Sequence, residues 1–129
     1  MGYPRVKYQH ISYKVNAVGQ EITIDAETDK LYETCTGINV LLTDELAKFS
    51  TVQLEINGQE VFPENFEAVR LMFRPHAPFG FDYHRLNEPA GGSKIKGKYK
   101  DVAGATSYPY IVTFSFRLEN PESTDTGTK

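Results

Sequence analysis

Four lysines occupy every second position in one short segment, GGSKIKGKYKD at residues 91–101. Alternate side chains of a strand point to the same face, so the four ammonium groups form a stripe. The stripe could contact nucleic acid, dock an acidic protein surface, or be the solvated, edge-protecting face of a strand. The lysine stripe, which is the candidate partner-docking site, consists of Lys94, Lys96, Lys98 and Lys100.

The nucleic-acid interpretation of the lysine stripe has two weaknesses. Sheets that bind single-stranded nucleic acid usually add exposed aromatic side chains on which bases stack. The neighbouring aromatic, Tyr99, is expected on the opposite face from the lysines. The net charge of −3 is also unlike that of a generic nucleic-acid-binding protein, which is basic. We therefore expect no nucleic-acid partner.

Histidine and carboxylate side chains come close together in RPHAPFGFDYH, at His76, Asp82 and His84. Two imidazoles and a carboxylate could hold a divalent metal ion. Their spacing matches no compact metal motif, and surface or loop-packing roles are the alternative. We assign no metal or cofactor to the chain and leave open whether these three residues hold an ion.

Three further carboxylates alternate in IDAETDK, at Asp25, Glu27 and Asp29. Such a set could collect calcium, but the segment lacks the glycine and the distal glutamate of an EF-hand loop. A solvated strand end is the expected role.

Nucleophilic chemistry has little support in the sequence. The single cysteine, Cys35, lies in an apolar, β-prone segment and is expected to be a buried structural thiol. The chain contains no G-x-S-x-G motif, and PAGGSK does not match a phosphate-binding loop. We expect no catalytic residues and no enzymatic activity.

Length and composition indicate one folded domain. The chain has 129 residues, of which 40% are hydrophobic, and it is long enough for a sizeable core. No apolar run approaches the roughly 20 residues that span a bilayer, so no transmembrane segment is expected. The N-terminus, MGYPRVKYQH, has no apolar centre and does not resemble a signal peptide.

Charge is distributed unevenly along the chain. Residues 20–67 hold 11 acidic and two basic side chains, whereas residues 68–129 hold nine basic and six acidic ones. The acidic and basic segments could meet between copies of the chain, because complementary fields fix the register of association. They could equally intermix once the strands interleave.

A period of two dominates the hydrophobic pattern, which predicts strands. Gly, Pro and Asn separate them, as in an antiparallel sandwich or barrel of eight or nine strands. The expected strands cover residues 5–15, 21–26, 31–42, 51–56, 59–62, 68–74, the segment FGFDYHRL, SKIKGKYK and YPYIVTFSFRLEN.

Several details of these elements are specific enough to test. Asn57-Gly58 predicts a two-residue hairpin turn, and Pro63 is expected to end the returning strand. One short helix is expected over Thr43–Phe49, capped by Thr43. The predicted domain covers residues 1–119, and residues 120–129 are expected to be a polar tail. The predicted inward ladder of the last strand is Tyr110, Val112, Phe114, Phe116 and Leu118.

As a strand pattern, the chain from Val6 to Leu118 resembles single jelly-roll capsid proteins, such as the vertex (penton) and minor capsid proteins of tailless icosahedral bacteriophages. LEINGQEVFP and YPYIVTFSFRLEN are similar to jelly-roll strands bounded by turns. The family has no short motif from which residue roles could be transferred. The resemblance implies a jelly-roll fold, copies of itself or other capsid-type subunits as partners, and a location in the virion after assembly in the host cytoplasm.

Three functional hypotheses follow, and the third of them is an enzyme of unrecognised type. The first is a structural subunit of an assembly, such as a viral capsid or vertex protein, that acts through protein–protein contacts. The second is a β-sandwich binding module for a carbohydrate or a protein ligand. Sugar rings could stack on tyrosines, and the candidates are Tyr3, Tyr83, Tyr108 and Tyr110.

Overall fold

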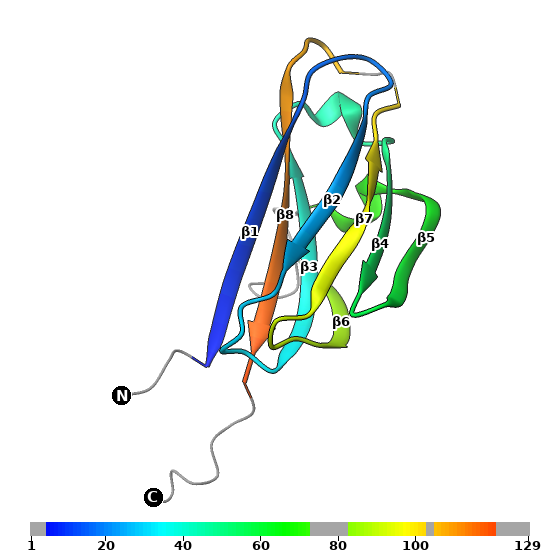
Figure 1. Cartoon of the computed structure of the whole chain (residues 1–129). Helices are drawn as coiled ribbons and strands as arrows, with labels where there is room; N and C mark the ends of the chain where they lie inside the picture. The colour runs from blue at the N-terminus through cyan, green and yellow to red at the C-terminus, as the bar shows by residue number, and fades with distance from the viewer. Residues whose placement is uncertain (1–4, 73–82, 103–104, 121–129) are drawn as a thin grey trace, which may run out of the picture.

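The protein is an antiparallel β-sandwich in a computed structural model that describes residues 5–72, 83–102 and 105–120. Eight strands form two four-stranded sheets that pack face to face (Figure 1). This confirms the predicted all-β class and sandwich architecture. The strands are β1 (Val6–Val15), β2 (Glu21–Glu27), β3 (Thr34–Leu42), β4 (Thr51–Ile56), β5 (Gln59–Glu67), β6 (His84–Pro89), β7 (Lys94–Lys100) and β8 (Tyr110–Glu119).

The strand order is that of a jelly roll. One sheet has the order β1-β8-β3-β6 and the other β2-β7-β4-β5. The first strand therefore pairs with the last, the second with the seventh, the third with the sixth and the fourth with the fifth. Such nested pairing arises when one long antiparallel hairpin rolls up into two sheets. Strands that are neighbours in space thus come from opposite ends of the chain.

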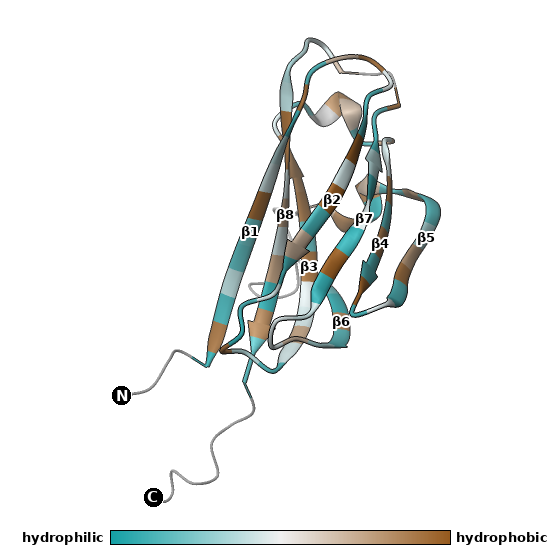
Figure 2. Cartoon of the chain, viewed as in Figure 1, coloured by the Kyte–Doolittle hydropathy of each residue, from teal (hydrophilic) through white to brown (hydrophobic). Residues whose placement is uncertain are grey.

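The core lies between the two sheets and is built mainly from alternate residues of strands such as β2, β4, β7 and β8 (Figure 2). All five members of the inward ladder predicted for β8 are buried, which confirms that prediction. The Phe114 ring joins the sheets, because its centroid lies 6.2 Å from those of Tyr13 on β1 and Tyr99 on β7. The outward ladder is less exposed than expected, since Ser115 is also buried.

The β4–β5 hairpin confirms the predicted Asn57-Gly58 turn. Both residues have positive φ, 55° and 79°, as a two-residue turn of this kind requires. The expectation that Pro63 ends the returning strand was wrong, because β5 continues to Glu67. β5 is an edge strand, where a residue without an N–H is tolerated. Its pairing with β4 shifts register on both sides of Leu54.

The strand predicted over residues 68–74 is also wrong in the part that the structure describes. Ala68–Leu71 form a 3₁₀ helix, η2. Ala68 and Leu71 are its two buried residues, three positions apart as the repeat of a 3₁₀ helix requires. The N–H groups of Ala68 and Val69 donate to the carbonyls of Ser50 and Lys48. These bonds tie the segment to the β3–β4 connection and remove it from a sheet ladder.

The predicted short helix is a single 3₁₀ turn, η1 (Glu45–Ala47). Its N-terminal acceptor is Asp44, whose Oδ1 accepts the N–H of Leu46 at 3.1 Å. Thr43, predicted as the cap, instead accepts the N–H of Ile111 and so ties the connection to β8. No helix in the described part of the chain is long and apolar enough to cross a membrane.

Hydrogen bonds set the start of β3 and hold the first residue of the predicted tail. β3 begins at Thr34 and not at residue 31, because Asp29 forms a turn by accepting the N–H groups of Leu31 and Tyr32. Asn120, placed in the predicted tail, is anchored through its backbone N–H to the carbonyl of Arg5. Residues 121–129 lie outside the described part of the chain.

Candidate functional site

The lysine stripe has the predicted orientation but not the predicted environment. Its four lysines are exposed on the outer face of β7, while Ile95 and Tyr99 between them are buried. β7 lies between β2 and β4. The edge-protecting role considered for the stripe is therefore wrong, because β7 is a central strand of its sheet.

Acidic residues flank the lysine stripe on both sides. On β2, Glu21, Asp25 and Glu27 stand directly opposite Lys100, Lys96 and Lys94. On β4, Glu55 stands opposite Lys96, and Gln53 stands opposite Lys98. The acidic and basic segments of the sequence thus intermix in one sheet. Local neutralisation of this kind weakens the field that the lysines would present to a distant anion.

The charges of this face are loosely paired. Among the described residues, the lysine stripe forms one ion pair, between Lys94 Nζ and Glu27 Oε2 at 3.7 Å. Both side chains of this pair are largely exposed, so it contributes only about 0–1 kcal/mol to stability. Lys96, Lys98 and Lys100 form no such pair with the residues that the structure describes. The stripe is therefore available for contact.

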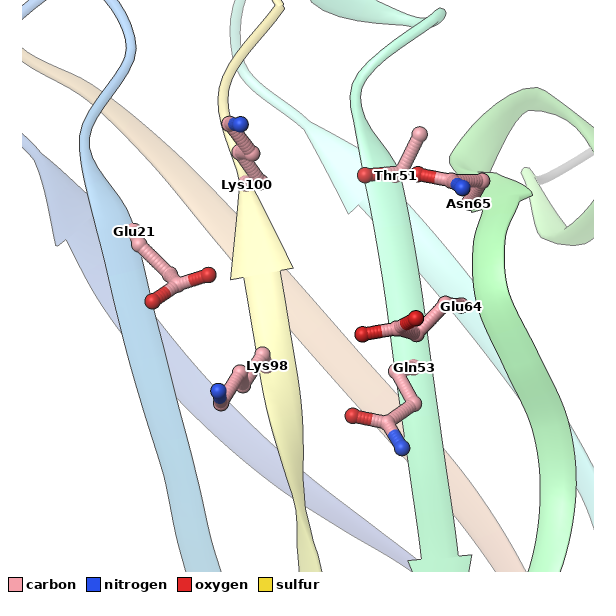
Figure 3. Close-up of a pocket in the computed structure, with 7 residues that line it drawn as sticks. All are labelled: Glu21, Thr51, Gln53, Glu64, Asn65, Lys98 and Lys100. Carbon is pink, nitrogen blue, oxygen red and sulfur yellow. The ribbon is translucent and has the colours of Figure 1, made fainter.

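A shallow pocket lies at one end of the lysine stripe (Figure 3). In Figure 3, Glu21 and Glu64 extend from β2 and β5 toward the β7 lysines. Two lysines and two carboxylates line the pocket together with uncharged polar groups. The pocket therefore does not select strongly for a ligand of either sign of charge. Its lining residues are Glu21, Thr51, Gln53, Glu64, Asn65, Lys98 and Lys100.

Gly97 brings β7 and β4 into close contact beneath this face. It stands opposite Leu54 in the ladder. A Cβ atom at position 97 would lie only 2.0 Å from the carbonyl oxygen of Gln53, closer than any real contact. The glycine is therefore required by a close approach of two backbones.

The metal-binding hypotheses gain no support from the described residues. Asp25 and Glu27 lie on the outer face of β2, whereas Asp29 is bound to Lys7 and to the N–H of Leu31. In the part of the chain that the structure describes, no three His, Cys, Asp or Glu side chains converge on one point. The ring of His84 contacts Phe62, with centroids 5.4 Å apart. The other two candidates, residues 76 and 82, lie outside the described residues.

Cys35 matches the expected structural thiol. It is buried, and burial raises the pKa of its thiol to about 11. Its Sγ contacts the Gly37 carbonyl oxygen at 3.8 Å. A thiol that stays protonated at neutral pH is a poor nucleophile, which is consistent with a packing role.

The outer face of the β1-β8-β3-β6 sheet carries neutral cross-strand pairs. His10 Nδ1 lies 2.6 Å from Ser115 Oγ, and the hydroxyls of Ser12 and Thr113 are 2.9 Å apart. Sequence reasoning missed these pairs, because they join residues from the two ends of the chain. The nested pairing of β1 with β8 brings them together.

Exposed apolar side chains gather at one end of the sandwich, which we call the loop end. The connections β1–β2, β3–β4 and β7–β8 meet there, at the top of Figure 1. Sequence reasoning did not identify this cluster, because its members are isolated apolar residues in three separate connections. The apolar residues exposed at the loop end are Val18, Leu46, Phe49 and Val102 in the connections, with Leu41 and Ile111 at adjoining strand ends.

A buried carboxylate joins the connections of the loop end. Asp101 is 2% exposed and accepts hydrogen bonds from the hydroxyls of Tyr108 and Tyr110, both at 2.7 Å, and from the N–H of Gly19 at 3.0 Å. Tyr110 in turn accepts a 2.7 Å hydrogen bond from Tyr99. Tyr110 is buried in this network, so its ring is no platform for a sugar, whereas the half-buried Tyr108 is held in place through its hydroxyl.

The hydrogen bonds also keep Asp101 ionised. Burial alone would raise the pKa of this carboxyl, but the bonds from Tyr110, Tyr108 and the loop backbone hold it below its usual value. The bond to Asp101 raises the pKa of Tyr108 to about 12. The carboxylate is thus a fixed negative charge shared by the β1–β2 and β7–β8 connections.

Comparison of the chain with protein-family models, with curated proteins and with solved structures found no match.

Proposed function

We propose that the protein is a structural subunit of an assembly that acts through protein–protein contacts, as capsid and vertex proteins of icosahedral phages do. One observation carries the proposal. Of the eight large apolar side chains that are exposed in the described part of the chain, six lie at the loop end of the jelly roll. Scattered apolar side chains are normal on a surface, whereas a cluster rimmed by polar groups is typical of an interaction site.

The loop end has the composition of an association surface. Leu46 and Phe49 follow each other closely around η1 and are 61% and 58% exposed. Burial of apolar area contributes about 25 cal/mol per Å², and aromatic anchors commonly dominate binding energy. Phe49 is the aromatic anchor of this surface.

The connections that carry these residues are held in place before any partner binds. Asp101 joins the β1–β2 and β7–β8 connections, and the Ser50 hydroxyl accepts the N–H of Val102. Asp44 Oδ2 accepts the N–H groups of Thr106 and Ser107. A surface that is ordered before association loses less conformational entropy when a partner binds. Such a surface favours the role of a structural subunit.

We propose that the partners are copies of this chain, other capsid-type subunits, or both. A virion location after assembly in a host cytoplasm follows from the same proposal. The lysine stripe is a second contact region within it, suited to an acidic surface that displaces the flanking carboxylates of β2 and β4.

The contribution of the loop end is tested with the double variant Leu46→Ser, Phe49→Ser. We expect wild-type protein to form larger species at high concentration or with candidate subunits, measured by light scattering, and the double variant to remain small. Leu31→Ser is the matched control, because Leu31 is 47% exposed but lies in the β2–β3 connection at the opposite end. Equal loss of assembly in both variants would remove the loop end from the proposal.

The viral part of the proposal needs a separate experiment. Particles that band in a density gradient should contain the chain in a fixed ratio to other subunits, by quantitative mass spectrometry. Absence of the chain from every particle fraction would contradict a virion role.

A binding module for a carbohydrate or a protein ligand is the second candidate, favoured by one aromatic pair. The Tyr8 and Tyr83 ring centroids lie 5.4 Å apart, and Tyr8 is 41% exposed on the outer face of its sheet. Glycan-array binding that Tyr8→Ala abolishes, in a protein that stays monomeric, would favour this candidate over assembly.

A further inference from the structure

The edge strand β1 presents a row of backbone groups that have no partner among the described residues. The N–H of Asn120 donates to the carbonyl of Arg5 at 2.9 Å, which places Arg5 among the residues whose backbone groups face β8. Backbone groups of an antiparallel edge strand alternate between its neighbour and the free edge. The residues of β1 that direct N–H and C=O groups to the free edge are therefore Val6, Tyr8, His10, Ser12 and Lys14.

The adjoining edge, on β2, is closed by side chains from β1. Gln9 Nε2 donates to the Glu27 carbonyl at 2.9 Å, and Gln9 Oε1 accepts the N–H of Asp29 at 3.0 Å. The Tyr13 hydroxyl accepts the N–H of Asp25 at 3.4 Å. An added strand would have to displace these groups from β2.

The two remaining edges are irregular. β5 contains Pro63, the positive-φ residue Asn65 and two register shifts. β6 has only six residues, ends at Pro89, and pairs with β3 across a register shift between Cys35 and Gly37. Prolines, bulges and short lengths are the usual devices that prevent edge-to-edge pairing.

β1 lacks these devices. It has ten residues, contains no proline, and pairs with β8 in an unbroken register. Lysines on an edge can also discourage pairing, but Lys7 is bound to Asp29. Lys14 is therefore the one lysine of the strand without an ion pair among the described residues.

We propose that β1 pairs with β1 of a second copy of this chain, antiparallel and about a two-fold axis, so that two four-stranded sheets become one continuous sheet. The charges of β1 make a second copy of this chain a suitable partner for its free edge. Residues opposite each other in an antiparallel pair point to the same face. Lys7 and Lys14 are separated by an odd number of positions, so they point to opposite faces and never oppose each other in this pairing.

One symmetric register fits the side chains best. With Ile11 opposite Ile11 of the second copy, Tyr8 lies opposite Lys14 and His10 opposite Ser12. Each of the free-edge groups on these four residues then finds an antiparallel partner. The lysine is placed beside an aromatic ring, where a cation–π contact is favourable. This contact is separate from the loop end and does not depend on the proposed capsid role.

The edge is tested by Ser12→Pro in the full-length chain. Proline at position 12 removes an N–H that points to the free edge and leaves the β1–β8 ladder intact. We expect wild-type protein to sediment as a dimer at high concentration and Ser12→Pro as a monomer, with unchanged far-UV CD. Thr113→Val is the control, because it removes the same Ser12–Thr113 side-chain contact without changing the edge, and it should remain dimeric.

Cysteine variants test the pairing without proline. Residues opposite each other at a non-hydrogen-bonded position have Cα atoms about 4.5 Å apart, within the range of a disulfide. Ile11→Cys should therefore form a cross-linked dimer on mild oxidation, whereas Val18→Cys, exposed at the loop end, should not. A wild-type protein that stays monomeric at every concentration, or a dimer that survives Ser12→Pro and fails to cross-link through position 11, would overturn the proposal. The Leu46→Ser, Phe49→Ser variant should still form the β1–β1 dimer. The loop-end proposal and the β1 proposal can therefore be contradicted independently of each other.

Discussion

The outer faces of the two sheets both contact water, but their side chains pair with one another in different ways. On the β2-β7-β4-β5 sheet, a central lysine strand runs between two strands that carry carboxylates. On the β1-β8-β3-β6 sheet, hydroxyl and imidazole groups pair across strands, as in Ser12 with Thr113 and His10 with Ser115. Among the described residues, the lysine stripe of the first face forms one long ion pair, whereas the second face has short contacts, including the 2.8 Å Arg117–Glu119 ion pair, and a buried Ser115.

The difference indicates which face depends on specific geometry. Exposed charges facing one another across strands contribute little energy each and tolerate rearrangement. Hydrogen-bonded groups that are shielded from water, such as the part-buried His10–Ser115 pair, lose more when one partner is removed. We therefore expect substitutions of the charged face to be mild and substitutions at shared, buried positions to be severe.

Phe114→Ala should have the largest effect, because this ring packs between the sheets against Tyr13 and Tyr99. Emptying such an aromatic site costs about 3–5 kcal/mol of unfolding free energy. Urea unfolding followed by tyrosine fluorescence measures the loss. Ile111→Ala, which changes an outward residue of the same strand, is the control and should change stability by about 0.5 kcal/mol. A cost below about 1 kcal/mol at position 114 would contradict the assignment of this ring to the core.

Gly97→Ala should weaken the charged sheet from within. The new methyl group would meet the Gln53 carbonyl in the neighbouring backbone, so β4 and β7 must separate, at a cost of about 1–3 kcal/mol. Gly37→Ala is the matched variant in the other sheet. There the methyl group would lie 3.1 Å from the Tyr83 Cβ atom, and a smaller loss is expected. Equal losses in the two variants would show that the close approach at Gly97 has no special role.

Asp101→Asn should destabilise the loop end, since the amide nitrogen that replaces one carboxylate oxygen cannot accept a hydrogen bond, and Tyr108 and Tyr110 donate to different oxygens. Leaving buried donors unsatisfied costs about 1–3 kcal/mol. The pKa of Asp101 is lowered in the folded protein, so its contribution is complete above the ordinary aspartate pKa of about 3.9 and declines as the pH falls below it. The difference in stability between wild type and variant should therefore narrow in acid. A difference that stays constant from pH 7 to about pH 2 would disagree with this linkage.

Replacement of the four lysines of the stripe by glutamine should have the smallest effect on stability, within about 1 kcal/mol, because these charges are exposed and loosely paired. We also expect no appreciable binding of labelled single-stranded DNA near about 150 mM salt by fluorescence anisotropy, since carboxylates flank the lysines. Low-micromolar, salt-sensitive binding of the DNA by the wild type, lost in the glutamine variant, would contradict the prediction that the lysine stripe does not bind nucleic acid.

Local patterns in the sequence predicted much of the fold. The period of two located β8 and β7 together with their inward faces, and Asn57-Gly58 predicted the turn between β4 and β5. The same period wrongly predicted a strand at Ala68–Leu71, where hydrogen bonds to Ser50 and Lys48 favour a 3₁₀ helix. Periodicity reports which side chains are buried, but it does not report which backbone partner is nearby.

The candidate surfaces were less predictable than the fold. The lysines and their common face follow from sequence alone, because alternation is a property of a single strand. Their position between two acidic strands follows from the pairing of β7 with β2 and β4. The cluster at the loop end likewise required knowledge of which connections lie at the same end of the sandwich.

The sequence by itself determined β7 and β8, their inward faces and the alternating lysines, since these depend on neighbours along the chain. Only the tertiary structure decided that β7 is central, that Asp101 is buried among tyrosines, and that one edge of β1 has no partner strand among the described residues. The physical reason is the nested pairing of a jelly roll. It places strands from the two ends of the chain side by side, so charge balance, burial and edge protection depend on contacts that no local window of sequence contains.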